Sequence, residues 1–218
     1  MPEPITLIGV GAGTVTLLGH LARRYFQTAK EVVDVLLGFA LGICALPILA
    51  VSALIIKLSG KGPVFISQSR VGKDGKVFGM YKLRTMYVHA ESASGAVWAE
   101  DNDPRVMPAC RWMRRSHIDE LPQLLNVIKG QMSIVGPRPE RPEIMAELEK
   151  AHPTVRKRLA VKPGITGLAQ VRNGYDTSVD AFRHKLAADL EYIEKRKWRL
   201  EARILLSTLP KLRDRKSR

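Results

Sequence analysis

Two adjacent carboxylates, Asp119 and Glu120, are the residues in this sequence best suited to chemistry. Three cationic side chains come shortly before them, at Arg111, Arg114 and Arg115. A carboxylate held beside groups that attract phosphate could act as a nucleophile or as a ligand of a metal ion. The same residue types are also typical of a capped helix end with surface ion pairs. These residues alone leave both interpretations open.

The residues after the acidic pair predict the helix that positions it. Apolar side chains recur at helical spacing, at Leu121, Leu124, Leu125 and Ile128. Pro122 has no N–H and its ring would clash inside a helix, so it fits only in the first turn. We therefore expect a helix that begins between Ser116 and Asp119 and ends at Lys129-Gly130. The N-terminus of that helix would favour the two carboxylates and an incoming phosphate.

The composition indicates an anionic partner. The chain has 218 residues and a formal net charge of +14, which suits acidic lipid, a phosphorylated substrate or nucleic acid. Only 6% of residues are aromatic, and no stretch alternates aromatic with basic residues, so stacking on single strands is not indicated. The two cysteines form no CxxC pattern and the five histidines no HExxH pattern, which argues against a zinc site.

A long apolar segment predicts contact with a membrane. Val35 to Ile56 is uncharged for 22 residues, enough to cross a hydrocarbon layer of about 30 Å. Pro47 lies near its middle, where a proline removes a backbone hydrogen bond and bends a helix. Basic residues flank both ends: Arg23, Arg24, Lys30, Lys57 and Lys61. Because such flanks prefer the cytoplasm, we expect a re-entrant helix–break–helix that enters and leaves by one leaflet, with a kinked single span as the alternative.

Residues 60–86 predict a β-hairpin. Two strand-like runs, Pro63–Ile66 and Val77–Met86, flank a turn at Lys73–Lys76. On the second strand, Lys82 and Arg84 would point to the same face, where two cations could bind a diphosphate. A solvated face is the other interpretation of such a pair.

Further along the chain, Arg138 stands between two prolines in Gly136-Pro137-Arg138-Pro139-Glu140. Each proline fixes its own φ and restricts the residue before it, so this arginine would be held extended and ready for a phosphate or a planar partner. The loop leads into a helix expected at Glu143–Ala151, with Pro142 as its first residue. Val179–Leu209 is expected to be helical as well, and its basic second half suits an anionic leaflet.

Taken in order, these stretches resemble the bacterial sugar transferases, the monotopic phosphoglycosyl transferases that begin lipid-linked glycan assembly. The resemblance covers about Lys30 to Leu209. Its carriers are the apolar segment with Pro47, Gly62-Pro63-Val64-Phe65, Gln68-x-Arg70-Val71-Gly72, Met80–Met86, Asp103-x-Arg105, Arg114-Arg115, Asp119–Gln123, Ser133–Glu140, Lys162–Gln170 and Asp189–Ile193.

The resemblance implies transfer of a sugar-1-phosphate from a nucleotide diphosphate sugar, usually a UDP-sugar, to polyprenyl phosphate, with Mg2+ and with release of UMP. It implies that Asp119 attacks the β-phosphorus and carries a covalent phosphosugar, that Glu120 binds Mg2+, and that Arg138 contacts phosphate or uridine. Further candidates for the substrate pocket are Lys82, Arg84, Arg105, Arg114, Glu140 and Arg172. Asp189 would be structural or help to order the site.

We therefore expect a mostly helical α+β protein in three parts. Residues 1–31 would be a membrane-associated or flexible segment and residues 32–58 the re-entrant membrane helix. Residues 59–218 would form a compact cytoplasmic catalytic domain with a small β-hairpin and amphipathic interfacial helices. The expected location is the cytoplasmic face of the bacterial inner membrane, with anionic lipid as a partner, no nucleic-acid partner, and a homodimer left open.

Two other functions compete with this interpretation. Asp101-x-Asp103 is similar to the metal-binding motif of glycosyltransferases that use nucleotide sugars and release UDP, although this spacing before a proline is also typical of an Asx-turn. The strongly basic chain would also suit a non-enzymatic adaptor at a membrane surface. The nucleotide that is released separates these alternatives.

Overall fold

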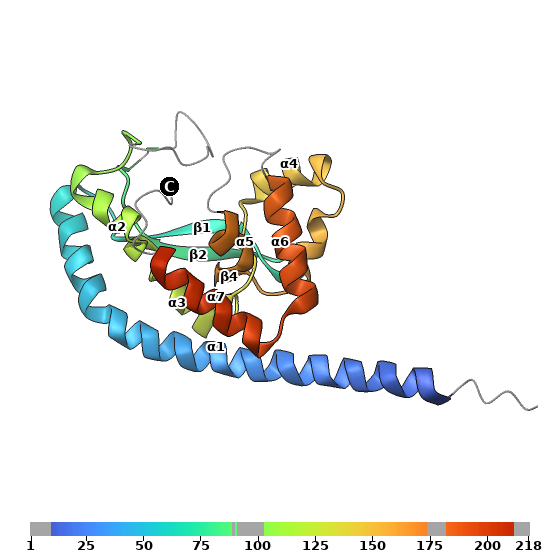
Figure 1. Ribbon diagram of the computed structural model, residues 1–218. Coiled ribbons are helices and arrows are strands. Elements are labelled where there is room, and N and C mark those ends of the chain that lie inside the picture. Colours follow the sequence, from blue (N-terminus) through green and yellow to red (C-terminus); the bar gives the residue numbers. More distant parts are fainter. Residues whose placement is uncertain (1–9, 89, 91–102, 174–181, 212–218) are drawn as a thin grey trace, which may run out of the picture.

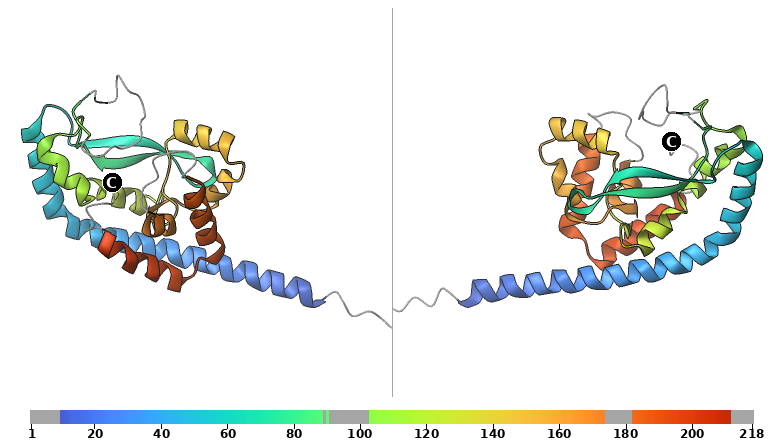
Figure 2. Two further views of the ribbon diagram at one scale, coloured as in Figure 1. Left: turned by 45° about the horizontal axis from the view of Figure 1, so that its top comes forward. Right: turned by 180° about the vertical axis from the view of Figure 1, so that it is seen from behind.

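The computed structural model describes residues 10–88, 90, 103–173 and 182–211. A single long helix, α1 (Val10–Ser59), lies along one side of a mostly helical domain that carries a small hairpin (Figure 1). Figure 2 shows from two further sides that the N-terminal part of α1 extends beyond this domain. This arrangement agrees with the expected mostly helical α+β class.

Helix α1 continues through Pro47 instead of breaking there. Figure 1 shows that its C-terminal part curves up around the domain, so the expected break is a bend within one helix. Its segment Leu21–Ser59 is long and apolar enough to cross a membrane, with a mean hydropathy of 2.6 in a window that is only 17% buried. A helix packed in a soluble core would bury most of that surface. Large apolar side chains are exposed at Leu36, Phe39, Ile43, Leu46, Val51 and Leu54.

The predicted hairpin is confirmed. Strands β1 (Phe65–Val71) and β2 (Val77–Leu83) pair antiparallel, with Ile66 opposite Lys82. Asp74 (φ 56°) and Gly75 (φ 79°) adopt left-handed backbone conformations in the turn. An aspartate and a glycine tolerate that region better than most residues, which explains why this short stretch reverses the chain.

The helix expected from residue 116 onward begins later. A short helix α2 (Arg111–Arg115) is followed by a 3-10 turn η3 (Ile118–Glu120), and the α-helix α3 spans only Gln123–Ile128. His117 adopts a left-handed conformation (φ 56°) that separates α2 from η3, so the helical backbone resumes at Ile118 as a 3-10 turn and becomes α-helical only at Gln123. The predicted glycine at the helix end is confirmed, since Gly130 has φ 72°.

A close backbone contact joins two loops through parallel strands β3 (Ser133–Val135) and β4 (Gly164–Thr166). A Cβ on Gly164 would lie 2.1 Å from the backbone N of Gly136, and a Cβ on Gly167 would lie 2.3 Å from the Gly136 carbonyl oxygen. Only glycine permits this approach. The loop that carries Arg138 is thereby pressed against the loop after Pro163.

Helix α4 (Pro142–Ala151) follows the Arg138 loop as predicted and begins with Pro142. It leads through a 3-10 segment η4 (Val155–Ala160) to strand β4 and then to a short helix α5 (Leu168–Asn173). The expected continuous helix Val179–Leu209 consists of two helices, α6 (Phe182–Lys195) and α7 (Trp198–Lys211). Residues 179–181 lie outside the described part, and α7 continues one residue past Pro210.

A buried polar network fixes α1 to the domain. Lys30 of α1 forms ion pairs with Asp34 (3.0 Å) and with Glu201 of α7 (3.1 Å). Its Nζ also donates to the Ser133 hydroxyl, which in turn donates to Asp34. The Tyr192 hydroxyl contacts Glu201 Oε1 at 2.7 Å and donates to the Val135 carbonyl oxygen at 2.9 Å. Helix α1 is therefore bonded directly to strand β3, which leads into the Arg138 loop.

Substitution of Lys30 by Met should destabilise the fold strongly, because it leaves two buried carboxylates without their cation. Breaking a buried ion pair costs about 3–5 kcal/mol. Denaturant unfolding in detergent micelles should show this loss. The matched control is Lys195→Met, whose partner Glu191 is on the surface and whose own side chain is 65% exposed, so its loss should stay below about 1 kcal/mol. Equal midpoints for the two variants would contradict the proposed role of the network.

Candidate functional site

The acidic pair is buried in turn η3, where Asp119 is 3% exposed and Glu120 is 6% exposed. The Glu120 N–H bonds back to the His117 carbonyl, and the Leu121 N–H bonds to that of Ile118, which is the 3-10 pattern. The next α-helix has only six residues. A helix this short has a small dipole, and the ion pairs of Glu120 come from side chains of two other segments.

Two cations hold Glu120. Lys82 Nζ of strand β2 lies 2.9 Å from Glu120 Oε1. Arg138 binds the same carboxylate with two nitrogens, Nη2 to Oε1 at 2.5 Å and Nη1 to Oε2 at 3.1 Å. The paired geometry of a guanidinium and a carboxylate makes this a strong contact. Strand β2, turn η3 and the Arg138 loop therefore meet at one carboxylate.

The electrostatic balance keeps Glu120 ionised. Burial alone would raise its pKa, but the charges of Arg138 and Lys82 outweigh burial and lower the pKa well below the usual range. Burial is also the main cause that lowers the pKa of Lys82, and Glu120 opposes that shift. Each group thus depends on the others for its charge, and the site carries an ionised carboxylate at neutral pH.

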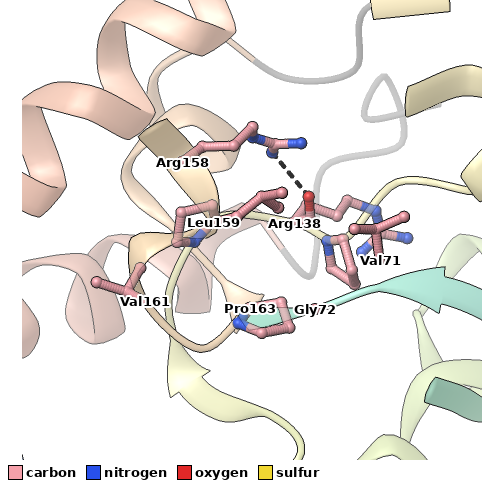
Figure 3. Close-up of a pocket in the computed structure, with 9 residues that line it drawn as sticks. Val71, Gly72, Arg138, Arg158, Leu159, Val161 and Pro163 are labelled. Atoms are coloured by element: carbon pink, nitrogen blue, oxygen red, sulfur yellow. Dashed lines mark hydrogen bonds between the residues drawn. The ribbon is translucent and has the colours of Figure 1, made fainter. Parts of the chain in front are cut away.

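Two arginines hydrogen-bond the backbone of the Arg138 loop, while the side chain of Arg138 binds Glu120. Arg158 Nη2 donates to the Arg138 carbonyl oxygen at 2.8 Å, and Arg70 Nη1 donates to the Pro139 carbonyl oxygen at 3.1 Å. Figure 3 shows the bond from Arg158 beside a small, open pocket. The pocket is lined by Val71, Gly72, Pro137, Arg138, Pro139, Arg158, Leu159, Val161 and Pro163. Its other walls are mainly apolar, and Asp119 and Glu120 do not line it.

Glu140 lies in a second buried cluster under this loop. Lys185 Nζ lies 2.7 Å from Glu140 Oε1 and Arg158 Nη1 lies 3.6 Å from it. Burial opposes ionisation, but Lys185 and Arg158 lower the pKa of Glu140 to about 2. Arg158 also binds Asp189 at 2.7 Å, where burial is the largest effect and raises the pKa of that carboxyl. The structure places Glu140 and Asp189 where they support the Arg138 loop.

The other predicted cations do not gather at Glu120. Arg84 is 4% exposed and donates to the carbonyl oxygens of Lys61 (2.7 Å) and Gly60 (2.9 Å), just past the end of α1. Arg114 Nη1 lies 3.4 Å from the Thr85 hydroxyl. Arg172 of α5 pairs with Glu191 of α6 on the surface. Of the predicted cations, Lys82 and Arg138 bind Glu120.

The aspartate motif of the alternative function is only partly described. Asp101 lies outside the described residues. Asp103 is bound by Arg105, whose Nε lies 2.9 Å and 3.0 Å from the two carboxylate oxygens. These hydrogen bonds lower the pKa of Asp103. Its carboxylate thus binds an arginine two residues away in the sequence. Such a local contact is typical of an Asx-turn, which the following proline favours.

The chemistry of the acidic pair fits Mg2+. A carboxylate offers about four lone-pair directions, and the three hydrogen bonds from Lys82 and Arg138 use three of them at Glu120. Mg2+ is commonly held by one or two carboxylates together with substrate phosphates. Among the described residues, no group of three or more metal-binding side chains occurs.

Arg158, Lys185, Lys30 and Asp34 support the site and were not identified from the sequence. Arg158 lies in the run Arg156-Lys157-Arg158, where nothing local separates it from its neighbours. Lys30 and Asp34 had a detectable signal, because a charged pair four residues apart beside a long apolar run is costly unless it has partners in the protein.

Comparison with known proteins identifies the family of the chain. Residues 25–215 match the model of the family described as bacterial sugar transferase. A Bacillus subtilis protein, provisionally named an undecaprenyl-phosphate N-acetylgalactosaminyl 1-phosphate transferase, is 49% identical over 65% of this chain and 78% of its own length. The UDP-glucose:undecaprenyl-phosphate glucose-1-phosphate transferase of Caulobacter vibrioides is 39% identical over 89% of this chain and 73% of its own length.

A third relative is the UDP-N-acetylgalactosamine-undecaprenyl-phosphate N-acetylgalactosaminephosphotransferase of Aeromonas hydrophila. It is 40% identical over 75% of this chain, which spans only 38% of that protein. The relatives carry different sugars in their names, so the match defines a class of enzyme and no single sugar. The family match extends over the acidic pair, the hairpin and the Arg138 loop, and the chain therefore belongs to the bacterial sugar transferases, a family of phosphoglycosyl transferases.

Proposed function

We propose that this enzyme transfers a sugar-1-phosphate from a UDP-sugar to undecaprenyl phosphate and releases UMP, as the first membrane step in assembling an exopolysaccharide or another glycoconjugate. The observation that carries the proposal is the buried acidic pair whose Glu120 is held by Lys82 and Arg138. The names of the relatives support the two substrates, since they pair UDP-sugars with undecaprenyl phosphate.

In the first step, the Asp119 carboxylate attacks the β-phosphorus of the UDP-sugar. A bond forms between Asp119 and phosphorus while the bond from phosphorus to the bridging oxygen breaks, and UMP leaves with that electron pair. In the second step, an oxygen of the lipid phosphate attacks the same phosphorus and releases Asp119. The positive charges of Lys82 and Arg138 would stabilise the negative charge that develops on the phosphoryl oxygens.

Glu120 has a different part in this scheme. Its carboxylate is bound by two cations, which reduces its strength as a nucleophile and suits it to binding. Glu120 would hold Mg2+ together with the diphosphate of the substrate. When bound, the ion would offset charge on the phosphates.

The membrane part of the proposal concerns α1. We propose that its apolar part enters and leaves the cytoplasmic leaflet of the inner membrane, and that the bend of the helix allows this. Basic residues at both ends of that part and the net charge of +14 support a cytoplasmic position against anionic lipid. Such a placement would bring the lipid phosphate to the domain from the side on which α1 lies. Residues 59–218 would then be the catalytic domain.

Asp119→Asn should remove turnover, because an amide cannot form the acyl phosphate. With a UDP-sugar labelled in its β-phosphate, the wild-type enzyme should retain label on the protein after denaturation and the variant should not. Glu147→Gln, a substitution at a surface residue of α4, serves as the control and should keep both activities. Labelled Asp119→Asn protein would show that another residue is the nucleophile.

The released nucleotide should be UMP, and release should stop when EDTA removes divalent metal and resume when Mg2+ is added. Chromatography of the products from a panel of UDP-sugars measures both effects and identifies the sugar. UDP as the sole product would instead support the glycosyltransferase alternative. Release of UMP that is insensitive to EDTA would rule out the metal role of Glu120.

Cysteine labelling can test the topology of α1. Tyr25 and Leu58 lie near the two ends of its apolar part and are 78% and 79% exposed. In a chain with Cys44 and Cys110 replaced, Tyr25→Cys and Leu58→Cys should both react only after a membrane-impermeant reagent gains access to the cytoplasm. Labelling of one of them in intact spheroplasts would establish a spanning helix.

A further inference from the structure

Gln123 is a buried amide that no described residue of the protein hydrogen-bonds. It is the first residue of α3 and is fully buried, with an exposed fraction of 0%. Neither its Nε2 nor its Oε1 has a hydrogen-bond partner among the described residues. An unpaired buried donor or acceptor usually costs about 1–3 kcal/mol, so stability does not account for this side chain.

Asn126, a second buried amide on the same helix, has the hydrogen bonds expected of a structural side chain. Asn126 is also fully buried, at 0% exposed. Its Nδ2 donates to the Gly79 carbonyl oxygen at 2.7 Å, and its Oδ1 accepts from the Tyr81 N–H at 3.0 Å. Those bonds fix α3 to strand β2. Gln123, one turn earlier, makes no such bond and differs in this respect from its neighbour.

The backbone places Gln123 on the side of the acidic pair. Leu121 (φ −54°, ψ −34°) and Pro122 (φ −61°, ψ −16°) both have helical conformations, so η3 runs into α3 without a break. Residues three apart overlie one another in a 3-10 turn, and residues four apart share a face in an α-helix. Gln123 is three residues from Glu120 and four from Asp119. It therefore follows the two carboxylates on one face.

We propose that Gln123 binds the reacting sugar phosphate, which rests on the function proposed above. Its amide N–H would donate to an oxygen of the phosphoryl group attacked by Asp119, and its carbonyl would accept from a hydroxyl of the attached sugar. A phosphoryl group offers only acceptors and a sugar hydroxyl can donate, so together they satisfy both unpaired atoms. An amide also adds no charge to a site that already holds two cations and two acids.

The test replaces Gln123 by Met, which has a similar volume and no amide. We expect the unfolding temperature to stay or rise, because an unpaired donor and acceptor are removed. The value of kcat/KM for the UDP-sugar should fall about ten- to a hundredfold, as for the loss of a hydrogen bond to a charged group. Inhibition by UMP should be unchanged, because UMP has neither the β-phosphoryl group nor the sugar.

Gln131→Met is the matched control. It makes the same chemical change at an exposed position three residues past the end of α3, where Gln131 Oε1 accepts from Asn126 Nδ2 at 2.8 Å. It should lose some stability and keep kcat/KM. Gln123→Leu is a second variant in case Met does not fit the space, and it should reproduce the fall in kcat/KM.

Three results would overturn the proposal. These are an unchanged kcat/KM in both Gln123 variants, UMP inhibition weakened as much as turnover, or a lower unfolding temperature, which would indicate a structural amide bonded through water. Calorimetric binding of the UDP-sugar to Asp119→Asn, with and without Gln123→Met, separates this inference from the proposed function. Absence of UMP release from the wild type would refute that function, and the calorimetric difference would still decide the role of Gln123.

Discussion

The structure of the site depends on one buried carboxylate, that of Glu120. An isolated carboxylate would be very costly in this environment, and the folded protein tolerates it because Lys82 and Arg138 approach from two other segments. Those partners are 38 and 18 residues away in the sequence. All three segments contribute to this balance, since removal of Glu120 would leave two cations beside each other and removal of either cation would leave Glu120 with a single charged partner. The same contacts concentrate positive charge beside Asp119.

The position of Arg138 in turn depends on a chain of contacts that ends at the long apolar helix α1. The Gly136–Gly164 approach and the bond from Arg158 fix its loop. Strand β3 immediately before that loop is bonded through Ser133 to Asp34 of α1. A shift of α1 against the domain would thus pull on the strand that leads to Arg138. The rigidity of this connection gives a physical reason why an enzyme acting on a lipid phosphate would fix its anchor to its site with buried charges.

Local signals in the sequence predicted the parts of the fold that local forces determine. The turn at Asp74-Gly75, the helix start at Pro142 and the glycine helix end at Gly130 each follow from the backbone preference of one or two residues, and each is confirmed. The predicted start between Ser116 and Asp119 coincides with the 3-10 turn η3, and only the α-helical part begins later, at Gln123. The left-handed conformation of His117, which sets that start, is more frequent for histidine than for most residues but too rare to predict from the residue type. The continuity of α1 through Pro47 was not predicted. A proline costs one backbone hydrogen bond, and a helix as long as α1 keeps enough of the others to continue past it with a bend.

The sequence identified the residues of the candidate site that lie in family motifs, but not the partners of their side chains. Asp119, Glu120, Lys82 and Arg138 lie in stretches that resemble one family. The ends of the long side chains were not predictable, because an arginine can reach several partners from one backbone position. Arg84 shows this clearly, since it lies two residues after Lys82 and yet its guanidinium binds the carbonyls that follow α1.

Chemistry also explains why two adjacent acids can have separate tasks. A carboxylate that accepts three hydrogen bonds from two cations is stabilised as an anion, and that stabilisation lowers its reactivity toward phosphorus. In the proposed two-step transfer, Glu120 would therefore hold charge in place through both steps. Asp119 would instead form and release a bond to phosphorus in each cycle. Asp119 is the adjacent acid in the same turn, so the cations that bind Glu120 would also lie beside the bond that Asp119 would make. Glu120 would then keep those positive charges in place while Asp119 reacts.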